Sequence, residues 1–386
     1  MGILTKTKSA FRKNCPDLKA LLLGDYPRFV YSSDITLPDE STIPVFCFHE
    51  VEATTFEQKL IYLQENGYDT IDSDEWLHSI VHGNDKTSKK VILTFDDGDV
   101  SLYRTVFPLL KKYQCKAVAF ICPGLIPEDQ SDPLLDCGRK LCTWSEIREM
   151  HESGHVDFQS HSFRHDLVFS SSKLEEFLHP KYKSHYFGKR DHAVVVNDGL
   201  GVTLTSLRSY EDQRSEEQWG APLFPLKPRL AVRQRFVCSG AVTEHICEFV
   251  KARSDRDFFL RKDAQKVLRQ ELSRARSNGL GKYLSAEEHQ RHNATELRMA
   301  KDAIEEKLPG KVVQHFCAPW FLATRKALDT AFSVGHVSVF LGGNVQTSGH
   351  STANNGRILV QRLSSSYIFR LPGRNRKGLL TSLLNS

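Results

Sequence analysis

The sequence VILTFDDG at residues 91–98 gives the first indication of both the fold and the site. Val91–Phe95 is a short, uninterrupted apolar run, which is typical of a strand that is buried on both faces. Asp96 and Asp97 follow at the carboxyl end of this run, and Gly98 provides a turn that can direct the two side chains differently. Carboxylates at the end of a buried parallel strand predict a functional site at that edge of the sheet.

Apolar runs of the same kind recur on both sides of this stretch, and most are followed by a helical pattern. The predicted strands are Ile43–Phe48, Val91–Phe95, Ala117–Ile121, Val156–Gln159, Val312–Cys317, Val337–Leu341 and Ile358–Leu363. Helices are predicted by capping boxes that start at Thr54 and Thr143, and by apolar spacing at about 101–113, 296–308 and 324–334. Strands that alternate with helices indicate an α/β protein with a parallel sheet. The number of strands favours a distorted (β/α)7-8 barrel over an open sheet.

The alternation is interrupted once, and this interruption divides the chain. Residues 171–293 contain a stretch rich in Pro and basic residues and then a highly charged segment, about 241–278, with a helical pattern. We therefore predict a large, mostly helical insertion, which is a candidate cap over the barrel mouth. The predicted parts are an N-terminal arm (1–40), the first part of the barrel (41–170), the insertion (171–293), the second part of the barrel (294–363) and a basic C-terminal tail (364–386).

The composition is that of a globular protein, with 386 residues of which 40% are hydrophobic and 26% are charged. A net charge of +5 is too small to indicate nucleic acid as the partner, and we expect none. The sequence contains no apolar run of about 18 residues, and its first residues lack the pattern of a signal peptide. Nine cysteines without a CxxC pair indicate reduced, mostly buried thiols. These features predict a cytoplasmic protein.

Two histidines follow another predicted strand, in the stretch Ser160-His161-Ser162-Phe163-Arg164-His165. Together with Asp97 they offer two nitrogen donors and one oxygen donor, a set that suits zinc or a similar divalent ion with open positions. Water bound to such an ion has a pKa of about 7 instead of about 15.7. Of the two adjacent carboxylates, one can then be a ligand while the other accepts the proton of the water. Two imidazoles and one carboxylate also hold iron in oxygenases, so this class of enzyme stays open here.

Three motifs resemble those of the polysaccharide deacetylase family, the NodB-homology domain of carbohydrate esterase family four. They are Thr94–Gly98, His161 to His165 and Phe316–Trp320, in this order along the chain. Pro44–Val51 also resembles the frequent opening strand of the family, which ends in a histidine, here His49. The resemblance covers about residues 40–170 and 294–363.

This resemblance implies a hydrolase that removes N-acetyl groups from a carbohydrate. The residues that would hold the metal ion, most simply Zn²⁺, are Asp97, His161 and His165. By position, Asp96 would be the general base, and a backbone N–H near Trp320 would bind the oxyanion of the tetrahedral intermediate. The candidates for contact with the substrate are His49, Pro319 and Trp320, whose ring would form a wall of the sugar pocket.

The sequence departs from the pattern of the family at two places. Cys317 stands where many members carry an arginine that tethers the base. No motif marks the late histidine that serves as general acid, for which His336 and His350 are the candidates. The same motifs would also fit a hydrolase of another amide, such as a sugar formamide, or an inactive sugar-binding member of the same fold.

The tail contains a basic and then apolar segment, Arg370–Leu380, with the pattern of a peripheral membrane contact. A membrane contact of this kind would suit a substrate at the inner face of the membrane. We therefore expect an intracellular polysaccharide or glycan precursor, with lipid-linked and nucleotide-linked forms both open.

Overall fold

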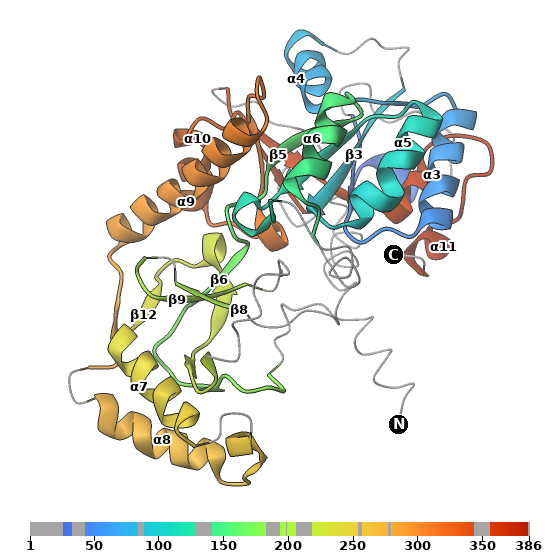
Figure 1. The fold of residues 1–386 in the computed structure, drawn as a ribbon. Helices are drawn as coiled ribbons and strands as arrows, with labels where there is room; N and C mark the ends of the chain where they lie inside the picture. Colours follow the sequence, from blue (N-terminus) through green and yellow to red (C-terminus); the bar gives the residue numbers. More distant parts are fainter. Residues whose placement is uncertain are drawn as a thin grey trace.

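The computed structural model describes residues 26–32, 43–83, 89–128, 141–182, 194–197, 199–205, 218–253, 257–276, 279–342 and 356–384, to which all structural statements below refer. These residues form a barrel lobe and a second lobe, which is drawn below the barrel in Figure 1. Most of the predicted N-terminal arm and the candidate acid His350 lie outside the described residues.

The barrel is a parallel sheet with the strand order β16-β15-β14-β5-β4-β3-β1-β17. The bounds of these strands are Val45–Phe48 (β1), Lys90–Asp97 (β3), Ala117–Ile121 (β4), Val156–Ser160 (β5), His315–Cys317 (β14), Ser338–Leu341 (β15), Ile358–Gln361 (β16) and Leu363–Ser364 (β17). A short strand, Asp69–Thr70 (β2), pairs in parallel with β3. All strand pairs of the sheet are parallel, as the alternation of strands and helices predicts.

One continuous segment joins the two ends of this sheet. β16 pairs with β15, β17 pairs with β1, and only Arg362 separates β16 from β17. Residues 358–364 therefore belong to both edges, and the described strands form a nearly closed ring of seven positions. The predicted distorted (β/α)7-8 barrel is confirmed.

The alternation of side chains decides which residues point into the barrel, because successive residues of a strand face opposite sides. Ile92 on β3 and Val360 on β16 belong to the interior cluster. Leu93 belongs instead to the cluster under the outer helices. Steps of two residues along each strand place Asp96 and Arg362 on the inner side, near the carboxyl ends of the strands. The fold thus directs a carboxylate and a guanidinium into the same interior.

Helices cover the barrel, and their bounds are Ala53–Glu65 (α3), Ser73–His82 (α4), Phe107–Tyr113 (α5), Trp144–Glu152 (α6), Ala286–Lys307 (α9) and Arg325–Ser333 (α10). The capping box at Thr143 and Glu146 is confirmed at the start of α6. The box predicted at Thr54 is wrong, because Glu52 is the N-cap of α3 and accepts hydrogen bonds from the backbone amides of Thr54 and Thr55. The glutamate side chain thus satisfies amides that the helix itself leaves open.

Two other helices differ from their predicted extent. The helix expected at about 101–113 is a π-helical turn, Leu102–Val106, followed by α5, which has Pro108 in its first turn. A proline there lacks only an N–H that the first turn of a helix does not need. The helix expected from Glu296 begins already at Ala286, where Ser285 and Glu288 form a capping box.

The second lobe combines an antiparallel sheet with helices. Its strand order is β13-β12-β6-β9-β8, with β11 on β6, and β7 pairs separately with β10. The bounds are Asp166–Phe169 (β6), Glu176–Phe177 (β7), Val194–Asn197 (β8), Val202–Thr205 (β9), Pro222–Leu223 (β10), Leu226–Pro228 (β11), Phe236–Cys238 (β12) and Gly281–Tyr283 (β13). Gly240–Lys251 (α7) and Ala264–Ala275 (α8) confirm the helices predicted over about 241–278.

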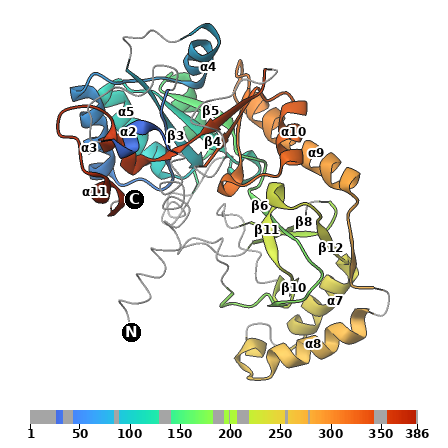
Figure 2. The same ribbon diagram turned by 180° about the vertical axis from the view of Figure 1, so that it is seen from behind.

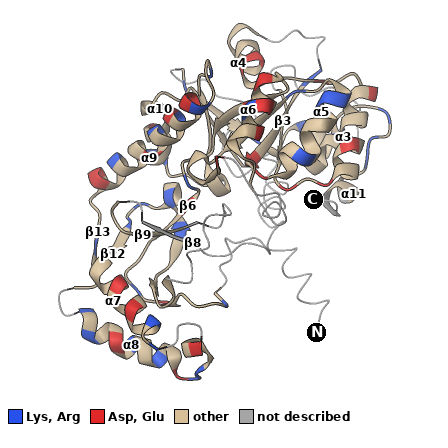
Figure 3. Ribbon diagram, viewed as in Figure 1, with Lys and Arg blue, Asp and Glu red and all other residues tan. Residues whose placement is uncertain are grey.

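The sheet of the second lobe was not predicted, because strands of two to four residues are too short for a visible alternation. The lobe has a hydrophobic core of its own, formed by the sheet together with α7 and α8. Figure 3 shows acidic and basic residues mixed along α8 and α9, so neither helix presents charges of one sign only.

The C-terminal segment packs against the short helix Arg28–Tyr31 (α2), as Figure 2 shows. Arg370 donates hydrogen bonds to the carbonyl oxygens of Val30 and Ser32, at 3.1 and 2.7 Å. Arg376 donates to the carbonyl oxygens of Phe29 and Ser32, both at 2.7 Å. The guanidinium groups of these two arginines therefore bind backbone oxygens of the same chain. This arrangement does not support the predicted membrane contact of the tail. The described helices include none long and apolar enough to cross a bilayer.

Candidate active site

Asp97, His161 and His165 meet at the carboxyl ends of β3 and β5. The Nε2 atoms of both histidines lie 3.5 Å from Oδ1 of Asp97. One donor atom from each of the three residues lies within 4.8 Å of the other two. The structure thus brings together the three residues that the sequence analysis predicts as metal ligands.

The ring of His161 is held in the orientation that a ligand needs. Its Nδ1 atom lies 2.9 Å from the carbonyl oxygen of Cys317 on β14 and donates a hydrogen bond to it. This bond fixes the proton on Nδ1 and leaves the lone pair of Nε2 directed toward Asp97. Burial lowers the pKa of His161 to about 4, so the ring is neutral near pH 7, as metal ligation requires.

Left-handed backbone conformations are concentrated at this place. Asp97, Ser162 and His165 have φ values of 70°, 70° and 52°, and Trp320 and Phe321 have 52° and 61°. Residues other than glycine rarely adopt this backbone conformation, and each one that does lowers the stability of the fold by on the order of 1–3 kcal/mol. The turn at the end of β3 is thus formed by Asp97 itself, together with Gly98 at φ 78°. The left-handed turn moves the side chain of Asp97 out of the alternation that directs Asp96 into the barrel.

Glu296 on α9 supports the loop between the two histidines. Its Oε1 atom accepts hydrogen bonds from the backbone amides of Phe163 and Arg164, at 2.6 and 3.3 Å. The side chain is buried, and this burial raises the pKa of Glu296 to about 7 despite the nearby charge of Arg229. Two consecutive amides that point at one oxygen fix the course of the loop, and thereby the directions of His161 and His165.

Asp96 forms a buried ion pair with Arg362. The guanidinium donates to both carboxylate oxygens, with Nη1–Oδ1 and Nη2–Oδ2 distances of 2.6 and 2.7 Å. The side chains are 1% and 0% exposed, so water does not screen the pair. Burial alone would raise the pKa of Asp96, but the charge of Arg362 outweighs it and holds this pKa well below its usual range. The carboxylate is therefore ionised at neutral pH.

Arg362 provides the arginine that is missing at position 317, where Cys317 stands instead. The thiol of Cys317 is buried in the interior cluster and belongs to β14. The arginine that pairs with Asp96 instead comes from the segment that closes the barrel, between β16 and β17. A bidentate guanidinium thus tethers the carboxylate from another strand.

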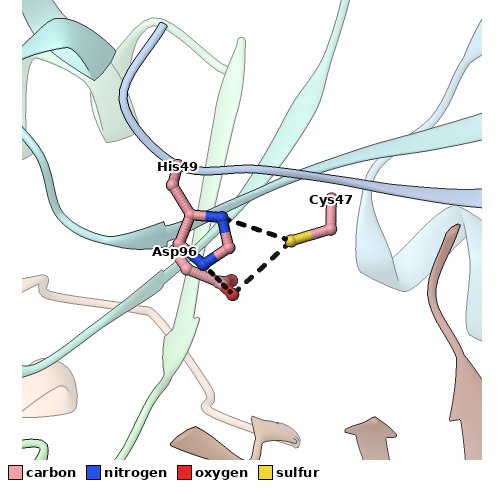
Figure 4. Close-up of side chains that lie close together, drawn as sticks. All are labelled: Cys47, His49 and Asp96. Carbon is pink, nitrogen blue, oxygen red and sulfur yellow. Dashed lines mark hydrogen bonds and ion pairs between the residues drawn. The ribbon is translucent and has the colours of Figure 1, made fainter. Parts of the chain in front are cut away.

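His49 lies beside Asp96, as Figure 4 shows. Its Nε2 atom is 3.7 Å from Oδ2 of Asp96, and its side chain is 54% exposed. Desolvation lowers the pKa of His49, but the interaction with Cys47 and the charges of Asp96 and Asp97 outweigh this effect and raise it. The ring also contacts Phe321, at 6.2 Å between centroids. His49 is therefore positioned beside both carboxylates, in contact with solvent.

The third motif contributes a wall of the same site. The rings of Trp320 and His165 lie 3.9 Å apart between centroids. Pro319 is buried and lines a small cavity together with Ser162, Arg229 and Glu296. Trp320 thus lies beside His165, one of the predicted metal ligands. Contact of Trp320 and of Pro319 with a substrate stays a prediction.

His336 lies elsewhere in the barrel. It precedes β15 at the amino end of that strand, whereas Asp97 and both ligand histidines follow the carboxyl ends of β3 and β5. It is buried, and its ring packs on Phe316 at 5.5 Å between centroids. The position does not support a role as general acid.

The family model described as "Polysaccharide deacetylase" matches residues 83–183. This stretch of the chain is similar to the polysaccharide deacetylase family. The matched residues include Asp96 and Asp97 as well as His161 and His165, so the two motifs that form the site both lie within the match. The resemblance that the motifs indicate is therefore confirmed.

Curated relatives of this chain include two proteins named as N-deacetylases. The poly-beta-1,6-N-acetyl-D-glucosamine N-deacetylase of Escherichia coli (strain K12) is 28% identical over 152 residues, which are 38% of this chain and 22% of that protein. The protein of the same name from Staphylococcus aureus (strain N315) is 29% identical over 119 residues, which are 31% of this chain and 38% of that protein. The matched part thus spans well under half of each relative. The solved structure of IcaB from Ammonifex degensii has a TM-score of 0.47 and 14% identity, and the alignment covers 87% of this chain and 98% of that one.

The sequence analysis did not identify two residues of the site, Arg362 and Glu296. Arg362 could have been noticed in the sequence, because it is a charged residue within the apolar run Ile358–Leu363. A buried charge in a strand predicts a partner of opposite charge in the interior. Glu296 could not have been noticed in the sequence, because a glutamate within a charged helix is typical of an exposed face.

Proposed function

We propose that this protein is a metal-dependent hydrolase that removes N-acetyl groups from the amino sugars of a polysaccharide or glycan precursor. The observation that carries the proposal is an ionised, tethered Asp96 directly beside three side chains that could hold a metal ion together. This arrangement matches general-base hydrolysis at a divalent ion.

The residues present fit a divalent ion. Two neutral imidazole nitrogens and one carboxylate oxygen are the donors that zinc commonly takes in catalytic sites, and Cys317 fixes one ring through its carbonyl oxygen. Asp97, His161 and His165 would hold the ion. An ion there would supply a Lewis acid and lower the pKa of a water near Asp96. We propose Zn²⁺ as the resident metal.

Asp96 is placed to accept the proton of the attacking water at Oδ2, the oxygen that faces His49. Arg362 keeps the carboxylate ionised and oriented, because it binds both oxygens from inside the barrel. The water-derived oxygen forms a bond to the carbonyl carbon of the N-acetyl group, and the C–N bond then breaks. A backbone N–H near Trp320 is our proposed donor to the oxyanion.

The leaving amine needs a proton, and His49 is the group best placed to give it. It lies 3.7 Å from Asp96, is half exposed to solvent, and has a raised pKa. A protonated imidazole beside the base can serve as general acid. This assignment takes the place of His336, which lies at the opposite end of the barrel.

We propose N-acetylglucosamine units as the substrate, because the relatives named above are N-deacetylases of poly-beta-1,6-N-acetyl-D-glucosamine. Lipid-linked or nucleotide-linked precursors and a cytoplasmic location stay predictions from the sequence. The test is incubation of the zinc-loaded protein with β-1,6-linked N-acetylglucosamine oligomers, measuring released acetate and new free amines in equal amounts. Release by the wild type but not by Asp96→Asn supports the proposal. Release of formate from N-formyl oligomers alone, or binding without any release, would replace it.

A further inference from the structure

Cys47 and His49 lie two residues apart at the end of β1, so both side chains face the side of the strand on which Asp96 lies (Figure 4). The Cys47 Sγ atom is 3.8 Å from Nδ1 of His49 and 3.7 Å from Oδ2 of Asp96. His49 Nε2 is 3.7 Å from the same carboxylate oxygen. A thiol, an imidazole and a carboxylate thus contact one another in all three pairs.

These three side chains form a second donor set, and they share no residue with Asp97, His161 and His165. One donor atom of each lies within 4.8 Å of the other two. Bonds of about 2.0–2.3 Å around a tetrahedral zinc ion place its ligands about 3.3–3.8 Å apart. The observed contacts are already of this size, and the half-exposed ring of His49 can turn to direct one nitrogen at the centre.

The chemistry of the set selects the kind of ion. A thiolate favours zinc, cadmium or cobalt over magnesium or calcium, which prefer oxygen ligands. The guanidinium of Arg362 is bound to the same carboxylate and repels a further cation. The second set is therefore weaker than the first, and fills only after it.

We propose that Cys47, His49 and Asp96 bind a second, thiophilic divalent ion, which inhibits the enzyme. On binding, the thiol of Cys47 loses its proton to the buffer and a sulfur–metal bond forms, with no change of oxidation state. The ion occupies the Oδ2 atom of Asp96 and the imidazole of His49, so both proton-transfer groups are blocked. Binding at this set does not depend on the proposed function, whereas the inhibition does.

The test is a titration of the metal-free protein, residues 1–386, with Co²⁺, followed by absorbance. A cobalt–thiolate bond gives a near-ultraviolet charge-transfer band, which carboxylate and imidazole ligands do not give. The wild type should show this band only with the second equivalent. Cys47→Ser should still bind the first equivalent but lack the band. Cys247→Ser, a half-buried thiol on α7, is the matched control and should keep it.

Activity gives an independent readout. Release of acetate should rise with the first equivalent of Zn²⁺ and fall with excess, and Cys47→Ser should tolerate at least about tenfold more zinc relative to its own maximum. A band that persists in Cys47→Ser, or that disappears instead in Cys317→Ser, overturns the proposal. If the band is lost in Cys47→Ser but the wild type releases no acetate, the metal site is supported and the proposed function is rejected.

Discussion

Replacing Arg362 by methionine should destabilise the barrel strongly, because it leaves the carboxylate of Asp96 buried without its cation. The pair is bidentate, at 2.6 and 2.7 Å, and both side chains are at most 1% exposed. Loss of one partner of such a pair costs about 3–5 kcal/mol. We therefore expect the free energy of unfolding of Arg362→Met to fall by about that amount at pH 7.

The double variant Arg362→Met/Asp96→Asn separates the ion pair from the packing of the arginine. Since it removes both charges, it should be more stable than the sum of the two single changes predicts, by about 3 kcal/mol. Arg357→Met is the matched control. This arginine lies five positions earlier and pairs with Asp329 at 3.0 Å, but both side chains are about half exposed, so the cost should be at most about 1 kcal/mol.

Urea unfolding of the chelator-treated proteins measures these differences without a contribution from bound metal. If Arg362→Met loses no more stability than Arg357→Met, or if the single changes simply add in the double variant, the buried ion pair does not stabilise the barrel as argued.

Three further changes test other parts of the account. Glu296→Ala should weaken zinc binding by about 10–100-fold in a competition titration, because the backbone amides of the loop between His161 and His165 lose their hydrogen-bond acceptor. Glu296→Gln keeps an acceptor oxygen and should restore most of the zinc affinity. Equal zinc affinities in both variants would count against a positioning role of Glu296. His49→Gln should lower kcat at least about 100-fold and leave the zinc content unchanged, and an unaltered kcat would assign the general acid elsewhere. His336→Leu should reduce the loss of folding stability at acid pH. Burial lowers the pKa of His336 to about 3, with Lys301 and His315 as the facing charged and titratable groups, so the unfolded chain binds more protons below its pKa of 6.5. The contribution of this histidine to the free energy of unfolding is thus fully present above pH 6.5. It declines as the pH falls, by about 2 kcal/mol at pH 5. Unfolding of the variant should depend less on pH in this window, and an identical pH dependence would refute the assignment.

The barrel could be predicted from the sequence because its strands are continuous apolar runs that alternate with capped helices. The run at Val91–Phe95 and the two carboxylates after it place a site at the strand ends, and the structure confirms that Asp97 and both histidines meet there. The short strands of the second lobe could not be predicted. Each is stabilised by neighbours distant in the sequence, such as β6 by β11 and β9, rather than by its own pattern.

The parts of the site that sequence reasoning missed depend on closure and on long-range contacts. Arg362 reaches Asp96 only because the last strand closes the ring, a register that no local pattern encodes. Glu296 reaches the histidine loop from a helix more than 130 residues away in the sequence. His49 was predicted as a substrate contact, and its place beside Asp96 follows from the pairing of β1 with β3.

The metal content of three proteins tests the central claim most directly, namely that ligands and base are separate neighbours. After reconstitution with one equivalent of zinc and gel filtration, elemental analysis should find about one ion per chain in the wild type and in Asp96→Asn. It should find almost none in His161→Ala. Equal zinc in all three proteins, or equal loss in Asp96→Asn and His161→Ala, would contradict the division of roles between Asp96 and the group of Asp97, His161 and His165.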